Sequence, residues 1–262
     1  MPSYYERVGE HLYRPTEHTG GAWREDEQHF SPVGGVIMHA VDRHLAARPE
    51  GPRLVVGRIS FDILGQLGRS EMDIRVESVR PGRTIELLEA TAVIAGRAAV
   101  RARVWLLSEQ DTSAVAGGAD DRLTPPDALP GWPMDELWSG GYIASLDVRP
   151  VGTPVPGRGT VWLSSPVTLV ADEPSSPLAS YVALVDTANG IAVRQPPGKW
   201  IFPNVDLTLH LFRQPAAGGR WVGLDTTVVF GAAGQGLTST VLHDERGPLG
   251  RAEQMLTVRP LN

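Results

Sequence analysis

The chain has 262 residues, of which 42% are hydrophobic and 21% are charged, a composition typical of a folded globular protein rather than a disordered one. Its formal net charge of -6 disfavours general binding to nucleic acid, because an acidic surface repels a phosphate backbone. The sequence has no cysteine, which excludes disulfides, thiolate metal sites and a cysteine nucleophile.

The N-terminal residues, MPSYYERVGEHLYRP, are polar and charged, so we expect no secretory signal. No stretch of the sequence approaches the roughly 18 consecutive apolar residues that a membrane span requires. Together with the lack of cysteine, these features favour a cytoplasmic protein without a membrane span.

The first half of the chain predicts one helix followed by several strands. Residues 5–14 carry a short β pattern. Ser31 is a candidate N-cap with Pro32 in the first helical position, and apolar residues then recur at helical spacing up to Leu45. Four strand-like runs follow, in the order LVVGRISFDILG, EMDIRVESVR, TIELLEATAVI and AAVRARVWLL.

A segment rich in Pro, Gly, Ala and Asp, residues 108–133, separates this half from the next and is typical of a linker. Beyond it, GYIASLDVRP and GRGTVWLSS are predicted strands, and PLASYVALVDTANGI has helical periodicity. Four further strand-like runs complete the chain: VDLTLHLFR, RWVGLDTTVVF, GLTSTVLHDE and GRAEQMLTVRP.

The order of a helix followed by a meander of strands therefore occurs twice, which indicates an internal duplication. In the alignment of the two copies, Asp62 lies against Asp206, and this suggests a structural role for both. Each copy is predicted to be an α+β unit in which one helix is buried against a curved antiparallel sheet. We place the N-terminal unit at residues 1–110, the linker at 111–138 and the C-terminal unit at 139–262.

Four segments of the sequence carry a resemblance to a known family: RPTEHTGGAW with QHFSPVGGVIMHAV, SVRPGRTIELLEATAVIAGRAAVRARVWLL, ALVDTANGI, and FPNVDLTLHLFRQP with LHDERGPLGRAEQMLTVRP. They are similar to the acyl-CoA thioesterase II family, over essentially the whole chain. The resemblance implies a double hot-dog fold, in which each curved sheet wraps around its central helix. It also implies hydrolysis of an acyl-CoA or acyl-carrier thioester in lipid metabolism, and a homo-oligomer.

The resemblance further implies that a water molecule attacks the thioester. Carried over to this sequence, the residues around that water are Asp186, Asn204 and Gln254, with Asn204 at a position where some members have Thr. Such a reaction requires no metal and no cofactor, and coenzyme A enters only as part of the substrate. The seven histidines of the chain have no spacing typical of a zinc site.

The chemistry of these side chains fits the implied reaction. Asp186 can orient or deprotonate the water, and the two amides can hold it. Gln254 shares one strand face with Leu256 and Val258, and an amide on an apolar face is costly unless it is paired. We expect the thioester carbonyl at the start of the first helix, near the backbone N–H groups of Gly34, Gly35 and Val36, or near the facing helix that carries Asp186.

Several alternatives remain open from the sequence. Gly34 and Gly35 can equally serve close packing of the helix, and His29 is either a substrate contact or an exposed loop residue. His39 and Asp42 could form the Asp/His pair of a hot-dog dehydratase or hydratase, or of an enzyme that tailors thioester-bound acyl chains. A non-catalytic acyl-thioester-binding protein is the third possibility. Any of six tryptophans could line an acyl tunnel: Trp23, Trp132, Trp138, Trp162, Trp200 and Trp221.

Overall fold

The computed structural model describes residues 1–49 and 53–261. Its α-helices are α1 (Phe30–Ala46), α2 (Gly141–Ala144), α3 (Pro177–Val185) and α4 (Ala188–Ile191), and its 3-10 helices are η1 (Glu17–Thr19), η2 (Ser113–Val115), η3 (Pro126–Ala128) and η4 (Met134–Glu136). The strands are β1 (Ser3–Arg7), β2 (Leu12–Pro15), β3 (Leu54–Ile63), β4 (Met72–Arg80), β5 (Ile85–Ile94), β6 (Arg97–Ser108), β7 (Asp147–Pro150), β8 (Arg158–Ser164), β9 (Thr168–Val170), β10 (Trp200–Ile201), β11 (Asp206–Leu211), β12 (Val222–Phe230), β13 (Gln235–Asp244), β14 (Gly247–Thr257) and β15 (Arg259–Pro260).

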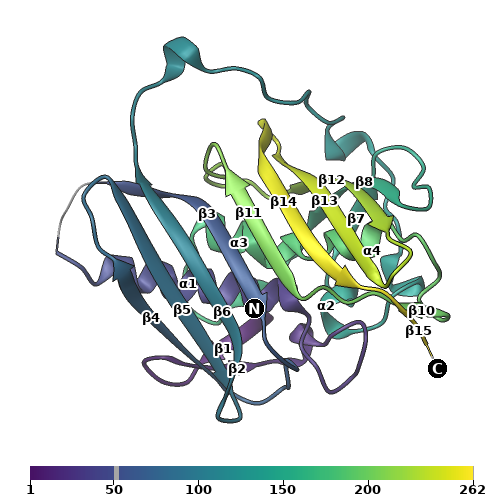
Figure 1. The fold of residues 1–262 in the computed structure, drawn as a ribbon, viewed down its shortest axis with the longest axis horizontal. Coiled ribbons are helices and arrows are strands. Elements are labelled where there is room, and N and C mark those ends of the chain that lie inside the picture. The colour runs from purple at the N-terminus through teal and green to yellow at the C-terminus, as the bar shows by residue number, and fades with distance from the viewer. Residues whose placement is uncertain (50–52, 262) are drawn as a thin grey trace.

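One sheet runs through both halves of the chain in the order β7-β8-β12-β13-β14-β11-β3-β6-β5-β4-β2-β1-β9, and β10 pairs with β15 separately. The halves join where β3 and β11 pair antiparallel, as Figure 1 shows in the middle of the molecule. Asp62 and Asp206, which the sequence alignment placed against each other, are direct partners across this junction. The strand β1 also pairs, in parallel, with β9 of the second half.

The two longer helices, α1 and α3, lie together behind the sheet (Figure 1). Helix α1 is buried over most of its length, from Phe30 to Val41. The close approach of the helices depends on Gly35, because a Cβ atom there would lie 2.5 Å from the Cβ of Ala183 on α3. Glycine at this position therefore serves helix packing, and the packing holds the start of α1 beside the end of α3.

Most predicted elements agree with the structure, but the helix predicted over PLASYVALVDTANGI is divided at Asp186 into α3 and α4, and the short strands β9, β10 and β15 were not predicted. Two further segments differ. Helix α1 begins earlier than predicted, because His29, and not Ser31, is the N-cap and its side chain accepts a hydrogen bond from the Ser31 N–H. The segment predicted as the strand GYIASLDVRP begins instead with the short helix α2 and becomes strand β7 only at Asp147. The buried side chains of Tyr142 and Ile143 gave this helical turn the apolar appearance of a strand.

The connecting segment between the halves loops away from the sheet and returns along the second half (Figure 1). Its returning part is held by hydrogen bonds from the Trp162 indole to the Thr124 carbonyl (2.8 Å) and from Arg149 to the Pro126 carbonyl (3.1 Å). The indole of Trp138, at its end, donates to the carbonyl of Gly190 on α4 (2.9 Å). The division of the chain at residues 110 and 138 stays a prediction.

Candidate active site

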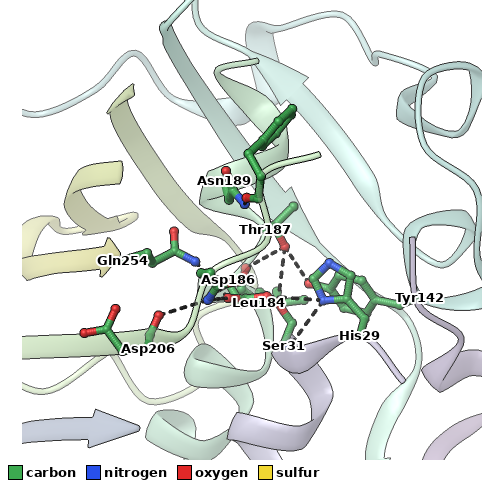
Figure 2. A network of polar contacts seen from close by, with 11 residues as sticks. His29, Ser31, Tyr142, Leu184, Asp186, Thr187, Asn189, Asp206 and Gln254 are labelled. Atoms are coloured by element: carbon green, nitrogen blue, oxygen red, sulfur yellow. Dashed lines mark hydrogen bonds and ion pairs between the residues drawn. The ribbon is translucent and has the colours of Figure 1, made fainter. Parts of the chain in front are cut away.

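Asp186 lies at the C-cap of α3 and only 6% of its surface is exposed. Its Oδ1 atom accepts two hydrogen bonds, from Nδ2 of Asn204 and from Nε2 of Gln254, both 2.8 Å long. Its Oδ2 atom lies 3.7 Å from Nδ1 of His29, on the opposite side (Figure 2). The structure thus brings together the three residues that the sequence selected, with both amides on one carboxylate oxygen.

The environment makes this carboxyl group a suitable proton acceptor at neutral pH. Burial raises the pKa of Asp186 from 3.8 to about 7, against the two amide donors, which lower it. Burial also lowers the pKa of His29 from 6.5 to about 3, so the imidazole is neutral and does not form an ion pair with Asp186. A carboxyl group with a pKa near the working pH is effective in both taking up and releasing a proton.

The two amides reach Asp186 from different strands and differ in their access to solvent. Asn204 precedes β11 and also donates to the Asp206 carbonyl (3.0 Å). Gln254 lies in β14, is 1% exposed, and its Oε1 atom is a buried acceptor with no partner among the described residues. Asn204 lines the pockets beside Asp186, whereas Gln254 lies behind the carboxylate. Gln254 therefore positions Asp186 and does not line either pocket. The sequence interpretation had instead placed Gln254 beside the attacking water.

A second set of polar contacts supports the other side of the site. The His29 ring stacks on the Tyr142 ring at 4.2 Å, and the Tyr142 hydroxyl lies 2.6 Å from the Thr187 hydroxyl. The Thr187 hydroxyl in turn donates to the Leu184 carbonyl (2.8 Å) and lies 3.5 Å from the Ser31 hydroxyl. This network, drawn in Figure 2, ties α2, the end of α3 and the start of α1 to one another.

Two pockets meet at the carboxylate, and Ala22, Trp23, His29, Asp186 and Asn204 line both of them. The wide pocket, of about 470 Å³, extends along Gln28 and Phe30 towards Ile63, Leu67 and Arg259. The narrow pocket, of about 30 Å³, ends against Met134, Trp138, Ile143 and Gly190. A substrate that places a reacting carbonyl at Asp186 can therefore occupy space on both sides of it.

Some predicted residues lie elsewhere. Gly34 and Gly35 face α3, and neither they nor Val36 line the two pockets at Asp186. Their role in holding the thioester oxygen stays a prediction. The residue of α1 that lines the wide pocket is Phe30, one turn earlier. Of the tryptophans, Trp23 and Trp138 line the narrow pocket.

The alternative pair on α1 does not form. His39 contacts Glu173 through Nε2 (3.1 Å), while one carboxylate oxygen of Asp42 is buried without a partner among the described residues. The histidine that lies beside Asp186 is His29. No cluster of potential metal ligands occurs in residues 1–49 and 53–261, and no helix of that part of the chain is long and apolar enough to cross a membrane.

His29 was considered from the sequence as a possible substrate contact, whereas Tyr142 and Thr187 were not selected. Histidine is not among the residue types that usually cap helices, so the sequence pattern favoured Ser31 as the cap. Nothing in the sequence pairs Tyr142 with Thr187, because they lie 45 residues apart and meet only in the folded chain. The fold and the site together define a hot-dog protein in which two amides hold a buried carboxyl group at the end of α3, beside the start of α1.

Comparison with protein families identifies the class more closely. The model of the acyl-CoA thioesterase N-terminal domain matches residues 19–107, and that of the acyl-CoA thioesterase C-terminal domain matches residues 125–258. The chain therefore belongs to the acyl-CoA thioesterase family, and it is a thioester hydrolase. Among curated proteins, no sequence matches the chain significantly.

Solved structures confirm the double hot-dog fold. The acyl-CoA thioesterase II TesB2 of Mycobacterium marinum is similar with a TM-score of 0.65 and 17% identity, covering 98% of this chain and 96% of that one. The tesB protein of Mycobacterium avium subspecies paratuberculosis has a TM-score of 0.69 and 16% sequence identity, with the same coverage of both chains. A hot-dog protein of unknown function from Alicyclobacillus acidocaldarius has a TM-score of 0.74 and 13% sequence identity, over 98% of this chain and 96% of that one.

Proposed function

We propose that the protein hydrolyses acyl-CoA thioesters with a water molecule that Asp186 activates. The observation that carries this proposal is the asymmetry of the carboxyl group. Its Oδ1 atom is held by the amides of Asn204 and Gln254, which leaves Oδ2 to accept a proton. Burial brings the pKa of Asp186 to about 7, so the same group can accept a proton and later release it.

In the proposed reaction, Oδ2 takes a proton from water while the water oxygen attacks the thioester carbon. The tetrahedral intermediate then collapses, the C–S bond breaks, and the proton on Asp186 passes to the departing sulfur. The products are the free thiol of coenzyme A and a carboxylic acid, which ionises in solution. These steps use water and side chains of the chain and call for no cofactor.

The developing negative charge on the thioester oxygen needs a donor opposite Asp186. Phe30 is the first residue of α1, so its N–H has no acceptor within the helix. The Ser31 N–H is taken by His29, and Pro32 has none to offer. Since Phe30 and Asp186 both line the wide pocket, we place the oxyanion at the Phe30 N–H.

The test is thiol release from a panel of acyl-CoA thioesters of different chain length. The wild-type protein should release thiol, and Asp186→Asn should lose at least a hundredfold in kcat because the proton acceptor is gone. Asp121→Asn is the matched control, since Asp121 is exposed on the connecting segment. Equal activity of Asp186→Asn and wild type would refute the role of Asp186.

One observation favours a second candidate, hydration of an enoyl thioester. Hydration needs a group that takes a proton from water and returns one to the substrate carbon, and Asp186, whose pKa is about 7, could do both in turn. Including a short enoyl-CoA in the panel separates the two reactions. Loss of the enoyl absorbance without thiol release would favour hydration, whereas thiol release favours hydrolysis.

We also propose that the protein forms a homo-oligomer in the cytoplasm. Val229, Leu237 and Met255 are register partners on neighbouring strands and are 40–61% exposed, so they form an apolar row on one face of the sheet. Exposed apolar rows of this kind favour contact with a second copy. Light scattering on Leu237→Asp should show a smaller particle than wild type, and an unchanged mass would contradict this surface.

A further inference from the structure

The narrow pocket at Asp186 is bounded on one side by residues 134–138, where the connecting segment returns to the second half of the chain. Met134 belongs to η4 and Trp138 follows it two residues after that helix ends. Both side chains are buried, and Trp138 is 5% exposed. Opposite them lie Ile143 of α2 and Gly190 of α4. This end of the pocket is therefore formed jointly by the connecting segment, α2 and α4.

Trp138 is fixed in this position from several sides. Its indole N–H donates to the Gly190 carbonyl (2.9 Å), and its ring meets the edge of the Trp23 ring at 4.9 Å between centroids. Trp23 in turn packs edge-on against Phe202 at 5.2 Å. An indole with a hydrogen bond and aromatic neighbours is held in one orientation, so it forms a rigid wall.

Backbone contacts keep the two tryptophan-bearing segments together. Gly140 has a φ angle of +114°, and a Cβ atom there would lie 2.5 Å from the Gly21 carbonyl oxygen. The Tyr142 N–H donates to the Gly20 carbonyl (3.2 Å). The segments that carry Trp23 and Trp138 therefore approach each other at the backbone, and the wall cannot withdraw without breaking this contact.

The remaining space beyond Trp23 is small. The narrow pocket, of about 30 Å³, is less than a tenth the size of the wide pocket, of about 470 Å³. The wide pocket suits the pantetheine arm of coenzyme A by its size and the phosphates by Arg259 on its lining, while Arg24 beside it is paired with Asp26. The apolar acyl chain, by contrast, suits the closed side, where Trp23, Met134 and Trp138 meet.

We propose that Trp138 and Met134 make this protein selective for thioesters of short acyl groups, of about two to four carbons. The proposal rests on the proposed thioesterase function. Longer chains would have to displace a packed aromatic cluster, and overpacking of this kind is costly. Because Met134 and Trp138 form this wall, the chain-length limit is set where the connecting segment meets the second half of the chain.

The experiment measures kcat/KM for acetyl-, butyryl-, hexanoyl- and octanoyl-CoA with wild type, Trp138→Ala and Trp221→Ala. Trp221 is a matched control, because it is also 5% exposed but lines neither pocket at Asp186. In wild type, acetyl-CoA should be cleaved at least tenfold more efficiently than octanoyl-CoA. Trp138→Ala should raise the ratio of octanoyl- to acetyl-CoA efficiency at least tenfold, and Trp221→Ala should leave that ratio unchanged.

Trp138→Phe and Met134→Ala remove less volume and should raise the ratio of octanoyl- to acetyl-CoA efficiency about threefold. They test the proposal even if Trp138→Ala fails to fold. A wild-type preference for octanoyl-CoA, or an unchanged ratio in folded Trp138 and Met134 variants, would overturn the short-chain assignment while leaving hydrolysis intact. Thiol release from none of the four thioesters would overturn the proposed function, and the assignment with it.

Discussion

Replacing Asp186 by Asn should change how the stability of the protein depends on pH. The pKa of Asp186 is raised by burial from 3.8 to about 7. Between these two values the folded protein holds a proton that the unfolded chain has released. The carboxyl group therefore stabilises the fold fully below about pH 4, and this stabilisation is lost as the pH rises through about 7.

The magnitude follows from the same two values. A difference between 3.8 and about 7 corresponds to about 4 kcal/mol in the free energy of unfolding, of which about 2.5 kcal/mol is lost between pH 5 and pH 8. Asparagine keeps an acceptor at the Oδ1 position for the amides of Asn204 and Gln254, but it does not titrate. Asp186→Asn should thus gain stability relative to wild type as the pH rises.

Urea unfolding at pH 5 and pH 8 measures this effect through the midpoint at constant slope. The free-energy difference between Asp186→Asn and wild type should be about 2.5 kcal/mol more favourable to the variant at pH 8 than at pH 5. Asp121→Asn, an exposed change of the same kind, should follow wild type at both values. A pH dependence shared by wild type and Asp186→Asn would refute the burial argument.

Two further predictions concern residues near Asp186. Gln254→Leu removes a donor that lowers the pKa of Asp186, so the rising limb of the variant's pH–rate profile should move to higher pH. Gln235→Leu, a change at an exposed glutamine, should leave the limb in place, and a limb unchanged by Gln254→Leu would contradict the positioning role. Gly35→Ala places a Cβ atom 2.5 Å from that of Ala183 and should cost about 1–3 kcal/mol in urea unfolding, whereas wild-type stability would show that the helices can separate freely.

The alternation of the strands was sufficient to predict a duplicated α+β arrangement, and the family resemblance supplied the hot-dog fold. From Val100 to Leu106 in β6 and from Gly250 to Leu256 in β14, every second residue is buried, which is the pattern that predicts one face on a core. The sequence was also sufficient for Gln254, since a glutamine on an apolar strand face requires a buried partner. That partner, Asp186, lies 68 positions earlier in the chain, so their hydrogen bond could be predicted only from the family resemblance.

The remaining features depend on tertiary contacts that leave no local pattern. For the glycines of α1 the sequence left substrate binding and close packing equally open, and the structure places Gly35 against Ala183. A helix rich in apolar residues on all sides does not reveal which face meets α3. Trp138 was one of six candidate tryptophans, and only the return of the connecting segment to Gly190 distinguishes it. A proline- and glycine-rich segment gives no periodicity from which such docking could be predicted.

The central claim is that a buried carboxyl group with a pKa of about 7 activates water for thioester hydrolysis. The most direct measurement is the pH dependence of kcat/KM for acetyl-CoA hydrolysis by the wild-type protein between pH 5 and pH 9. The rate should rise tenfold per pH unit below about 7 and level off above it, and Asp186→Asn should show no such limb. A profile that is flat from pH 5, or a limb that persists in Asp186→Asn, would contradict the account.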